Sequence, residues 1–322
     1  MASRPRDIFE PGGDFADAVL SGLAQTPKVV PARYFYDAAG SALFEAITAL
    51  PEYYPTRTEV GLLTAHAAEV AATAGPGRAV IEFGSGSSIK TPLLLRAIQP
   101  SAYVPIDISA DFLAESAAAL ASAFPGLPVT PLAGDFTHPL ALPDSIDGLP
   151  KIGFFPGSTL GNLTPPAAVD LLRSFAATLG GDAWLLIGLD LRKDRATLEA
   201  AYDDAQGVTA AFNLNVLHRI NAELGGTLDP TAFRHVARWN GDAGRVEMHL
   251  EARRALDFSV AGQSFRMAAG ETIHTENSYK WTLDEARLLA RAGGWDPRTV
   301  WLDSGARFGL HLWQVAAPRL EP

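Results

Sequence analysis

The stretch V80-I-E-F-G-S-G-S-S-I-K90 is an apolar run that ends in two glycines and a short polar turn. It predicts a strand that enters a tight turn before a helix. Gly84 and Gly86 can take positive φ angles and let a ligand approach the backbone, and the helix start offers unpaired N–H groups. Asp107 follows in a second apolar run, V-P-I-D-I, where its carboxylate can accept hydrogen bonds from both ribose hydroxyls of an adenosine. The two stretches together predict a site for a cofactor of the nucleotide type.

Strand-like and helix-like stretches alternate around this motif. The strand-like runs are 79–83, 103–106, 129–132, 151–155 and 183–189, and the helical stretches between them are 91–98, 110–123 and 166–179. Such βαβ alternation is typical of a parallel sheet covered by helices, and right-handed crossovers make it doubly wound. The fold class predicted is therefore α/β with a Rossmann-like sheet. Two last runs, 299–302 and 309–315, predict an antiparallel pair at one sheet edge.

The alternation stops between about Leu191 and Trp281. A helical stretch that holds residues 202–223 precedes strand-like pieces around 245–251 and 264–268, so we expect a second, α+β lobe inserted before the last sheet strands. Inserts of this size beside the carboxyl ends of strands commonly cover a substrate site. The expected organisation is an N-terminal helical segment, 1–56, that contributes to the substrate site, a cofactor domain, 57–192 and 283–322, and an inserted substrate-binding domain, 193–282.

The glycine turn discriminates between cofactors. A dinucleotide site favours G-x-G-x-x-G, but Ile89 occupies the third glycine position, whereas S-adenosylmethionine (SAM) has no pyrophosphate that must lie against the helix. Asp135 and Phe136 end the third βα unit, where a carboxylate can accept from an adenine amino group and a ring can stack on the base. Glu82 and Lys90 flank the turn and are candidates for the methionine part. An NAD enzyme and a catalytically silent nucleoside-binding module remain alternatives, as do glycines that serve only a turn and aspartates that only cap helices.

Composition narrows the range of partners. The 322 residues are 48% hydrophobic and 19% charged, which is ordinary for a folded enzyme. The net charge of -10 argues against nucleic-acid and anionic-membrane partners, because both require a basic surface. Without cysteine there is no disulfide and no thiolate nucleophile, and the seven histidines lack metal-ligand spacing, so no metal is expected. A charged N-terminus without an apolar signal segment favours the cytoplasm, and we expect a monomer that binds a small molecule.

Several longer strings carry a more specific signal. They are R-Y-F-Y-D-A-A-G-S-A-L-F-E from Arg33, L-P-E-Y-Y-P-T-R-T-E from Leu50, G-S-T-L-G-N-L-T-P from Gly157, A-Y-D-D-A-Q-G-V-T-A-A-F-N from Ala201 and T-E-N-S-Y-K from Thr275. Together they resemble the histidine N-alpha-methyltransferase family, SAM-dependent enzymes that make hercynine in ergothioneine biosynthesis. The resemblance spans nearly the whole chain.

The resemblance implies a Rossmann-like class I methyltransferase domain, an inserted substrate-binding lobe, and histidine held between them. It implies a donor site of Gly84, Lys90, Asp107, Asp135 and Phe136 for SAM, and the glycine turn itself adds Gly86 as a candidate. It also implies an acceptor site in which Tyr53, Gly157, Asn162 and Tyr202 hold the amino-acid end of L-histidine, and Met248, Glu276 and Ser278 line the imidazole pocket. Tyr36 and Tyr53 would orient the reacting nitrogen and are the candidate catalytic residues. No metal is implied.

Each assignment has an alternative. The three tyrosines can be core rings, and Asn162 can form only a turn. Glu276 and Ser278 lie two apart, so in a strand they share one face, and that face can be solvent. The acceptor can be another amino acid, such as tryptophan. The effect of Asn277 and Tyr279, which flank the proposed imidazole residues, is left open.

Overall fold

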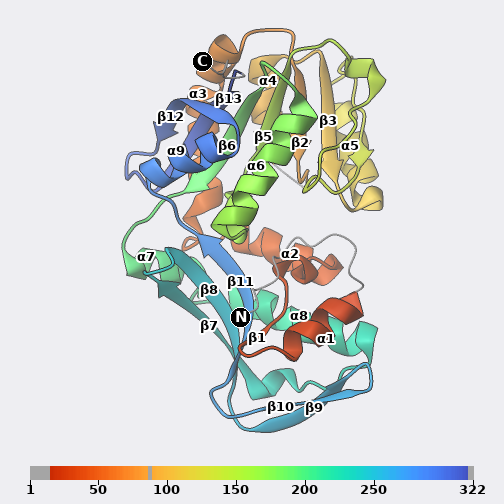
Figure 1. Ribbon diagram of the computed structural model, residues 1–322, viewed down its shortest axis with the longest axis vertical. Helices are drawn as coiled ribbons and strands as arrows, with labels where there is room; N and C mark the ends of the chain where they lie inside the picture. The colour runs from red at the N-terminus through yellow and green to blue at the C-terminus, as the bar shows by residue number, and fades with distance from the viewer. Residues whose placement is uncertain (1–14, 86–88, 318–322) are drawn as a thin grey trace, which may run out of the picture. The chain divides into compact units, whose positions relative to one another are not determined.

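The computed structural model describes residues 15–85 and 89–317, so Gly86 lies outside the described residues (Figure 1). The chain divides into two compact units. Unit 1 comprises Met1–Tyr54, Gly161–Thr164 and Arg192–Lys280, and unit 2 comprises Pro55–Leu160, Pro165–Leu191 and Trp281–Pro322.

Unit 2 contains a seven-stranded sheet. Its strands are β2 (Ala79–Phe83), β3 (Ala102–Asp107), β4 (Leu132–Ala133), β5 (Lys151–Phe155), β6 (Trp184–Asp190), β12 (Trp295–Leu302) and β13 (Phe308–Val315), in the order β12-β13-β6-β5-β2-β3-β4. The pairs among β2 to β6 are parallel, and β13 runs antiparallel to both β6 and β12. The predicted α/β fold class with an antiparallel pair at one edge is confirmed.

Helices cover both faces of this sheet. They are α3 (Tyr54–Ala74), α4 (Thr91–Ile98), α5 (Ala110–Ala123), α6 (Pro165–Leu179) and α9 (Leu283–Ala292), with short 3-10 turns η2 (Asp144–Ile146) and η3 (Thr159–Asn162). Figure 1 shows α6 across one face, where Phe175 stacks on Phe83 of β2 with ring centroids 3.8 Å apart. Apolar side chains of α3 and α4 share a second cluster with Val80 and Leu312. The continuous burial of β2 therefore follows from its packing between two helical layers.

The strand order reverses at β2. From β2 the chain passes to β3 and β4 on one side, and then returns to β5 and β6 on the other. In open α/β sheets, ligands bind outside the carboxyl ends of the strands at such a reversal. Gly84, after β2, and Gly157, after β5, lie at this point of the sheet.

The third predicted strand is shorter than expected. The prediction was 129–132, but β4 contains only Leu132 and Ala133, and Val129 forms one isolated bridge with Tyr103. Pro128 and Pro131 flank this bridge, and neither offers the N–H that a continuous ladder needs.

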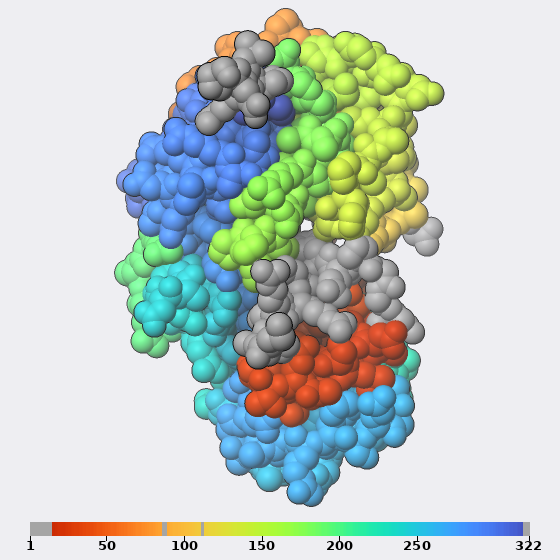
Figure 2. All heavy atoms as spheres, in the orientation of Figure 1, coloured from red at the N-terminus to blue at the C-terminus, as the bar shows by residue number. Residues whose placement is uncertain are grey.

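Unit 1 combines a four-stranded sheet with helices. The strands are β7 (Phe233–Asn240), β8 (Arg245–Ala252) and β11 (Thr272–Tyr279), with β1 (Lys28–Val29) completing the order β1-β11-β8-β7, and β9 (Leu256–Val260) and β10 (Gln263–Met267) form a separate hairpin. The helices are α1 (Phe15–Leu23), α2 (Ala38–Thr48), α7 (Arg195–Ala200) and α8 (Val208–Leu224), with turns η1 (Ala32–Phe35) and η4 (Pro230–Ala232). Figure 2 shows the hairpin on the surface of this unit. Because β1 pairs with β11, the N-terminal segment is part of the same body as residues 192–280.

The predicted helical stretch holding residues 202–223 is interrupted, and this prediction was wrong in detail. Helix α8 begins at Val208, after Gly207 with φ 74°, and Tyr202 lies in the preceding turn. The Asp204 carboxylate accepts hydrogen bonds from the N–H groups of Val208 (3.0 Å) and Thr209 (2.7 Å), which satisfies the first turn of α8.

Within residues 15–85 and 89–317, no helix combines the length and the hydropathy that a membrane span requires.

Candidate active site

The turn after β2 has the geometry that the sequence predicts. Gly84 has φ 73°, a conformation that side chains with a Cβ rarely adopt. Its N–H donates to the carbonyl of Ile106 (2.9 Å), which ties the turn to β3. A Cβ at Gly84 would lie 3.6 Å from Cζ of Phe136. The turn and the Phe136 ring are therefore in immediate contact.

The two predicted acids follow adjacent strand ends. Asp107 ends β3, and its carbonyl accepts from the N–H of Gly134 (3.0 Å). The loop that carries Asp135 therefore lies beside the end of β3. One Asp107 oxygen accepts from the Ser109 N–H (3.0 Å), and burial raises the pKa of its carboxyl. Asp135 accepts from both the N–H (2.9 Å) and the hydroxyl (2.6 Å) of Thr137. Each acid therefore also stabilises its own loop.

Phe136 is held by other aromatic rings. The centroids of Phe83, Phe155 and Phe175 lie 6.1, 6.1 and 6.0 Å from that of Phe136. These rings come from β2, β5 and α6, so elements far apart in the sequence fix the ring beside Gly84. Such aromatic pairs add about 0.5–1.5 kcal/mol each beyond their area burial.

Lys90 forms a buried ion pair that the sequence did not predict. Its Nζ lies 2.6 Å from Oε2 of Glu59, whose carboxylate is fully buried, and the same oxygen accepts from the Gly157 N–H (2.9 Å). Gly157, with φ 87°, lies close enough that a Cβ there would be 3.6 Å from Lys90 Nζ. Glu59 thus joins the glycine turn after β5 to the lysine before α4. The only sequence signal for it is its place at the end of L-P-E-Y-Y-P-T-R-T-E.

The same carboxylate constrains β6. A Cβ at Gly188 would lie 2.0 Å from Oε1 of Glu59 and 2.9 Å from Cζ of Phe308. We expect Gly188→Ala to lower the free energy of unfolding by about 1–3 kcal/mol, because a packed neighbour must move. Urea denaturation measures this loss. Gly181→Ala is the matched control, because nothing lies within 4 Å of its added Cβ; equal stability of the two variants would contradict the prediction.

Glu82, a candidate for the methionine part, is engaged inside unit 2. Both of its oxygens accept from the Thr91 hydroxyl (2.9 and 2.8 Å), and Oε2 accepts from the Tyr103 hydroxyl (2.6 Å). Burial raises the pKa of Glu82 to about 7, whereas these hydrogen bonds and the charge of Lys90 act to lower it. These hydrogen bonds join β2 to α4 and β3.

In unit 1, the sheet places the predicted imidazole residues on one face. Glu276 of β11 pairs directly with Met248 of β8, and Ser278, two residues on, shares that face. All three are buried, so this face is not solvent. Asn277 and Tyr279 point to the opposite face, where the Tyr279 hydroxyl accepts from Arg245 (2.7 Å). These two flanking residues therefore do not line the face of Glu276.

Three tyrosines cluster in unit 1, and one of them, Tyr36, lies near Glu276. The rings of Tyr53 and Tyr202 are 6.3 Å apart, and the ring of Tyr36 packs edge-on against Phe44 and Phe212, at 5.7 Å from each. Desolvation, followed by the charge of Glu276, raises the pKa of the Tyr36 hydroxyl well above its ordinary value, although 44% of the residue remains exposed. Tyr36 is therefore protonated at neutral pH.

Lys280 adds a positive group that sequence reasoning missed. Its Nζ donates to the hydroxyls of Tyr202 and Ser278, at 2.8 Å each, and those two hydroxyls are 2.7 Å apart. Burial raises the pKa of Glu276 to about 7, and the nearby charge of Lys280 opposes this rise. The positive charge of Lys280 therefore acts on all three of Tyr202, Ser278 and Glu276.

Asn162 lies beside the end of β11. It closes η3, and a Cβ on its neighbour Gly161 would be 2.7 Å from the Tyr279 carbonyl oxygen. Only glycine permits this approach of the loop to the strand. Unit 1 thus gathers Tyr36, Tyr53, Asn162, Tyr202, Met248, Glu276 and Ser278, whereas Gly157 belongs to unit 2 with the donor residues.

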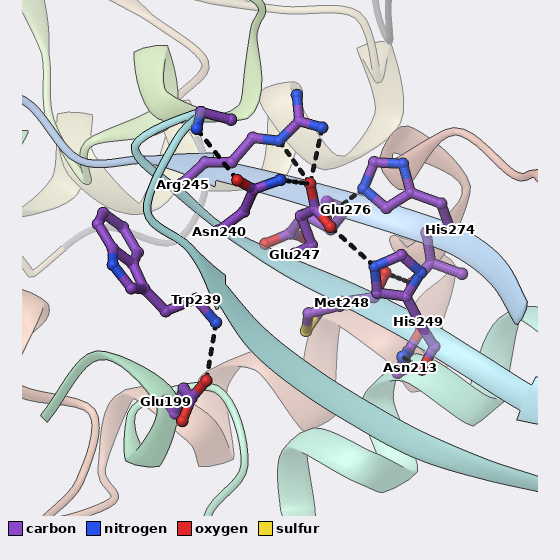
Figure 3. A network of polar contacts seen from close by, with 12 residues as sticks. Glu199, Asn213, Trp239, Asn240, Arg245, Glu247, Met248, His249, His274 and Glu276 are labelled. Atoms are coloured by element: carbon purple, nitrogen blue, oxygen red, sulfur yellow. Dashed lines mark hydrogen bonds and ion pairs between the residues drawn. The ribbon is translucent and has the colours of Figure 1, made fainter. Parts of the chain in front are cut away.

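A polar network supports the opposite face of this sheet (Figure 3). Glu247 accepts from Arg245 (2.9 Å) and Asn240 (3.0 Å) and lies 3.2 Å from Nε2 of His249. The hydrogen bond with His249, followed by those from Arg245 and Asn240, lowers the pKa of Glu247 against its burial. His274, whose pKa burial lowers to about 4, contacts the Glu276 carbonyl through Nε2 (3.0 Å). The network fixes the strands that carry Met248 and Glu276. No cluster of His, Asp and Glu suited to a metal ion occurs within residues 15–85 and 89–317.

Comparison with known proteins identifies the family of this chain. A family model described as "Histidine-specific methyltransferase, SAM-dependent" matches residues 15–315. The chain is 42% identical over 304 residues to the histidine N-alpha-methyltransferase of Mycolicibacterium smegmatis, covering 91% of this chain and 92% of that protein. It is 41% identical to the Mycobacterium tuberculosis protein of the same name, with the same coverage, and 31% identical to ergothioneine biosynthesis protein 1 of Neurospora crassa, over 89% of this chain and 33% of that protein. The chain therefore belongs to the family of SAM-dependent, histidine-specific methyltransferases.

Proposed function

We propose that this protein transfers three methyl groups from SAM to the α-amino nitrogen of L-histidine and so forms hercynine. The observation that carries the proposal is the buried Glu276, which lies opposite Met248 on one sheet face with Ser278 beside it. A carboxylate can accept from one imidazole nitrogen while a hydroxyl bonds the other, which an apolar pocket for a larger ring would not require. A site that forms a hydrogen bond with a polar group of its substrate strongly rejects analogues that lack this group.

Unit 2 supplies the donor site in this proposal. Asp107 takes the ribose hydroxyls, the loop of Asp135 and Phe136 takes the adenine, and Gly84 lets the donor approach the backbone. Lys90 and Gly157, joined through Glu59, border the same carboxyl ends of β2 and β5. The support is that Gly84 and Gly157 lie at the reversal of strand order, where such ligands bind, and that Asp107 and Asp135 follow the next two strands, β3 and β4.

Unit 1 supplies the acceptor site. Asn162 and Tyr202 donate to the substrate carboxylate, and Tyr36 and Tyr53 orient the amine. Methyl transfer from a sulfonium is an in-line displacement, so the amine must be neutral and aligned with the S–CH3 bond, and positioning provides much of the rate. Because the pKa of Tyr36 is raised, its hydroxyl stays protonated at neutral pH and serves as a hydrogen-bond partner rather than as the base. The activated donor makes a strong base unnecessary, and the proton leaves through water.

A screen of the amino acids with SAM labelled in its methyl group tests this function. We expect label on histidine and none on tryptophan. Label on tryptophan alone would transfer the proposal to another amino acid. Absence of any labelled product, together with absence of SAM binding, would favour a dinucleotide enzyme or a non-catalytic binding module.

The donor assignment has its own test. We expect Asp107→Ala to weaken SAM binding about 10- to 150-fold, since hydrogen bonds to a charged group contribute about 1.5–3 kcal/mol. Calorimetry with SAM measures the change, and histidine affinity should stay the same. Asp144→Ala, in the turn η2, is the control. Unaltered SAM affinity in Asp107→Ala would reject the ribose role.

A further inference from the structure

We infer that Lys280 is a positioning residue that turns Tyr202 and Ser278 into hydrogen-bond donors toward bound histidine. The inference rests on the proposed function and extends the acceptor site by one residue. Lys280 is 1% exposed, and its Nζ is within 2.8 Å of both hydroxyl oxygens. It also lies 4.7 Å from the centroid of the Tyr202 ring. Through these two hydroxyls, which face the substrate, the buried lysine affects substrate binding without contacting the substrate itself.

The direction of the hydrogen bonds follows from counting protons. An ammonium only donates, so Tyr202 and Ser278 must both accept from Lys280. Each hydroxyl then still has its own proton to donate. Their mutual contact of 2.7 Å uses at most one of these protons, so at least one O–H is directed away from the cluster. Without Lys280, either hydroxyl could rotate to accept from the ligand instead.

Donors of this kind match histidine at two points. A carboxylate only accepts, so the Tyr202 hydroxyl suits the carboxylate of the amino acid. The unprotonated ring nitrogen also only accepts, so the Ser278 hydroxyl suits it, while Glu276 accepts from the protonated ring nitrogen. With both protons directed at the ligand, the 2.7 Å contact between the two oxygens contains no hydrogen bond, and Lys280 Nζ, which donates to each of them, holds them together. Lys280 thereby favours one imidazole tautomer and supplies the positive charge that balances the carboxylate.

The test compares two ligands in two proteins. Histidine and histidinamide differ in that the amide replaces the carboxylate by a neutral group. Calorimetry on the full chain should show that the native protein prefers histidine, and that Lys280→Met reduces this preference about tenfold, since the charge that strengthens the hydrogen bonds is gone. SAM affinity should not change. A purely structural lysine would weaken both ligands equally.

Control variants separate the possible outcomes. Lys28→Met removes another lysine of unit 1, which pairs with Glu271 at 2.9 Å, and should leave the preference unchanged. Tyr202→Phe keeps Lys280 but removes one of its hydroxyls, so it should lose the preference as well, and Lys280→Gln, which also lacks the charge, replaces Lys280→Met if that variant does not fold. An unchanged preference in Lys280→Met or in Tyr202→Phe would overturn the inference. Failure of the native protein to bind histidine would instead reject the proposed function.

Discussion

Replacing Glu276 by alanine is expected to weaken histidine binding about 30- to 150-fold and to leave SAM binding unchanged. The carboxylate is buried opposite Met248, so its loss leaves an imidazole N–H in the pocket without an acceptor. Hydrogen bonds to charged groups contribute about 1.5–3 kcal/mol, and because Glu276 is buried we expect the upper part of that range, about 2–3 kcal/mol, which corresponds to this change in affinity. Calorimetry with each ligand separately measures both parts of the prediction. Unchanged histidine affinity would show that Glu276 does not contact the ring.

The same residue predicts a pH dependence. Burial raises the pKa of Glu276 to about 7, so below that pH the free protein mostly holds a proton there, which must leave before the carboxylate can accept from the ring. Histidine affinity should therefore rise with pH up to about 7 and then level off. Histidine itself titrates in this range, so Glu276→Gln, which cannot titrate, is the control. An equal pH dependence in both proteins would contradict ionisation of Glu276 on binding.

Glu59→Ala should have the largest effect on stability. It removes the partner of Lys90 at 2.6 Å and the acceptor of the Gly157 N–H, and both of these groups are only partly exposed to water. Breaking a buried pair on one side costs about 3–5 kcal/mol of unfolding free energy. Urea denaturation measures it, and SAM affinity should fall because Lys90 and Gly157 lose their common support.

An acid on the same helix provides the comparison. Glu69 of α3 pairs with His66 at the surface, so Glu69→Ala should destabilise the protein far less. If both variants lost the same stability, burial of the Glu59 pair would not be the cause. If Glu59→Ala lost stability but kept native SAM affinity, Glu59 would support the fold without shaping the donor site.

The sheet of unit 2 was largely predictable from the sequence. The bounds predicted for β2 and β5 agree with the structure because strands buried on both faces appear as short apolar runs. The strands of unit 1 were harder to find. In β11, T-I-H-T-E-N-S-Y, polar side chains occupy buried positions, so no alternation of apolar and polar residues marks the strand. The polar residues that serve the site therefore remove the sequence pattern by which the strand that carries them could be predicted.

The candidate site was predictable where a motif places one residue after a strand, as for Gly84 and Asp107. Sequence reasoning missed Glu59 and Lys280, because a charged residue has no local signature of burial. Their partners lie far along the chain, at Gly157 for the first and at Tyr202 for the second. Only the folded chain shows that these charges are matched by N–H and hydroxyl groups rather than by water.

Incubation of the purified protein with SAM and L-histidine, followed by mass spectrometry and NMR of the product, tests the central claim most directly. The account predicts a product that carries three methyl groups, all on the α-amino nitrogen. A histidine that gains no mass, or one methylated on its ring, would contradict it.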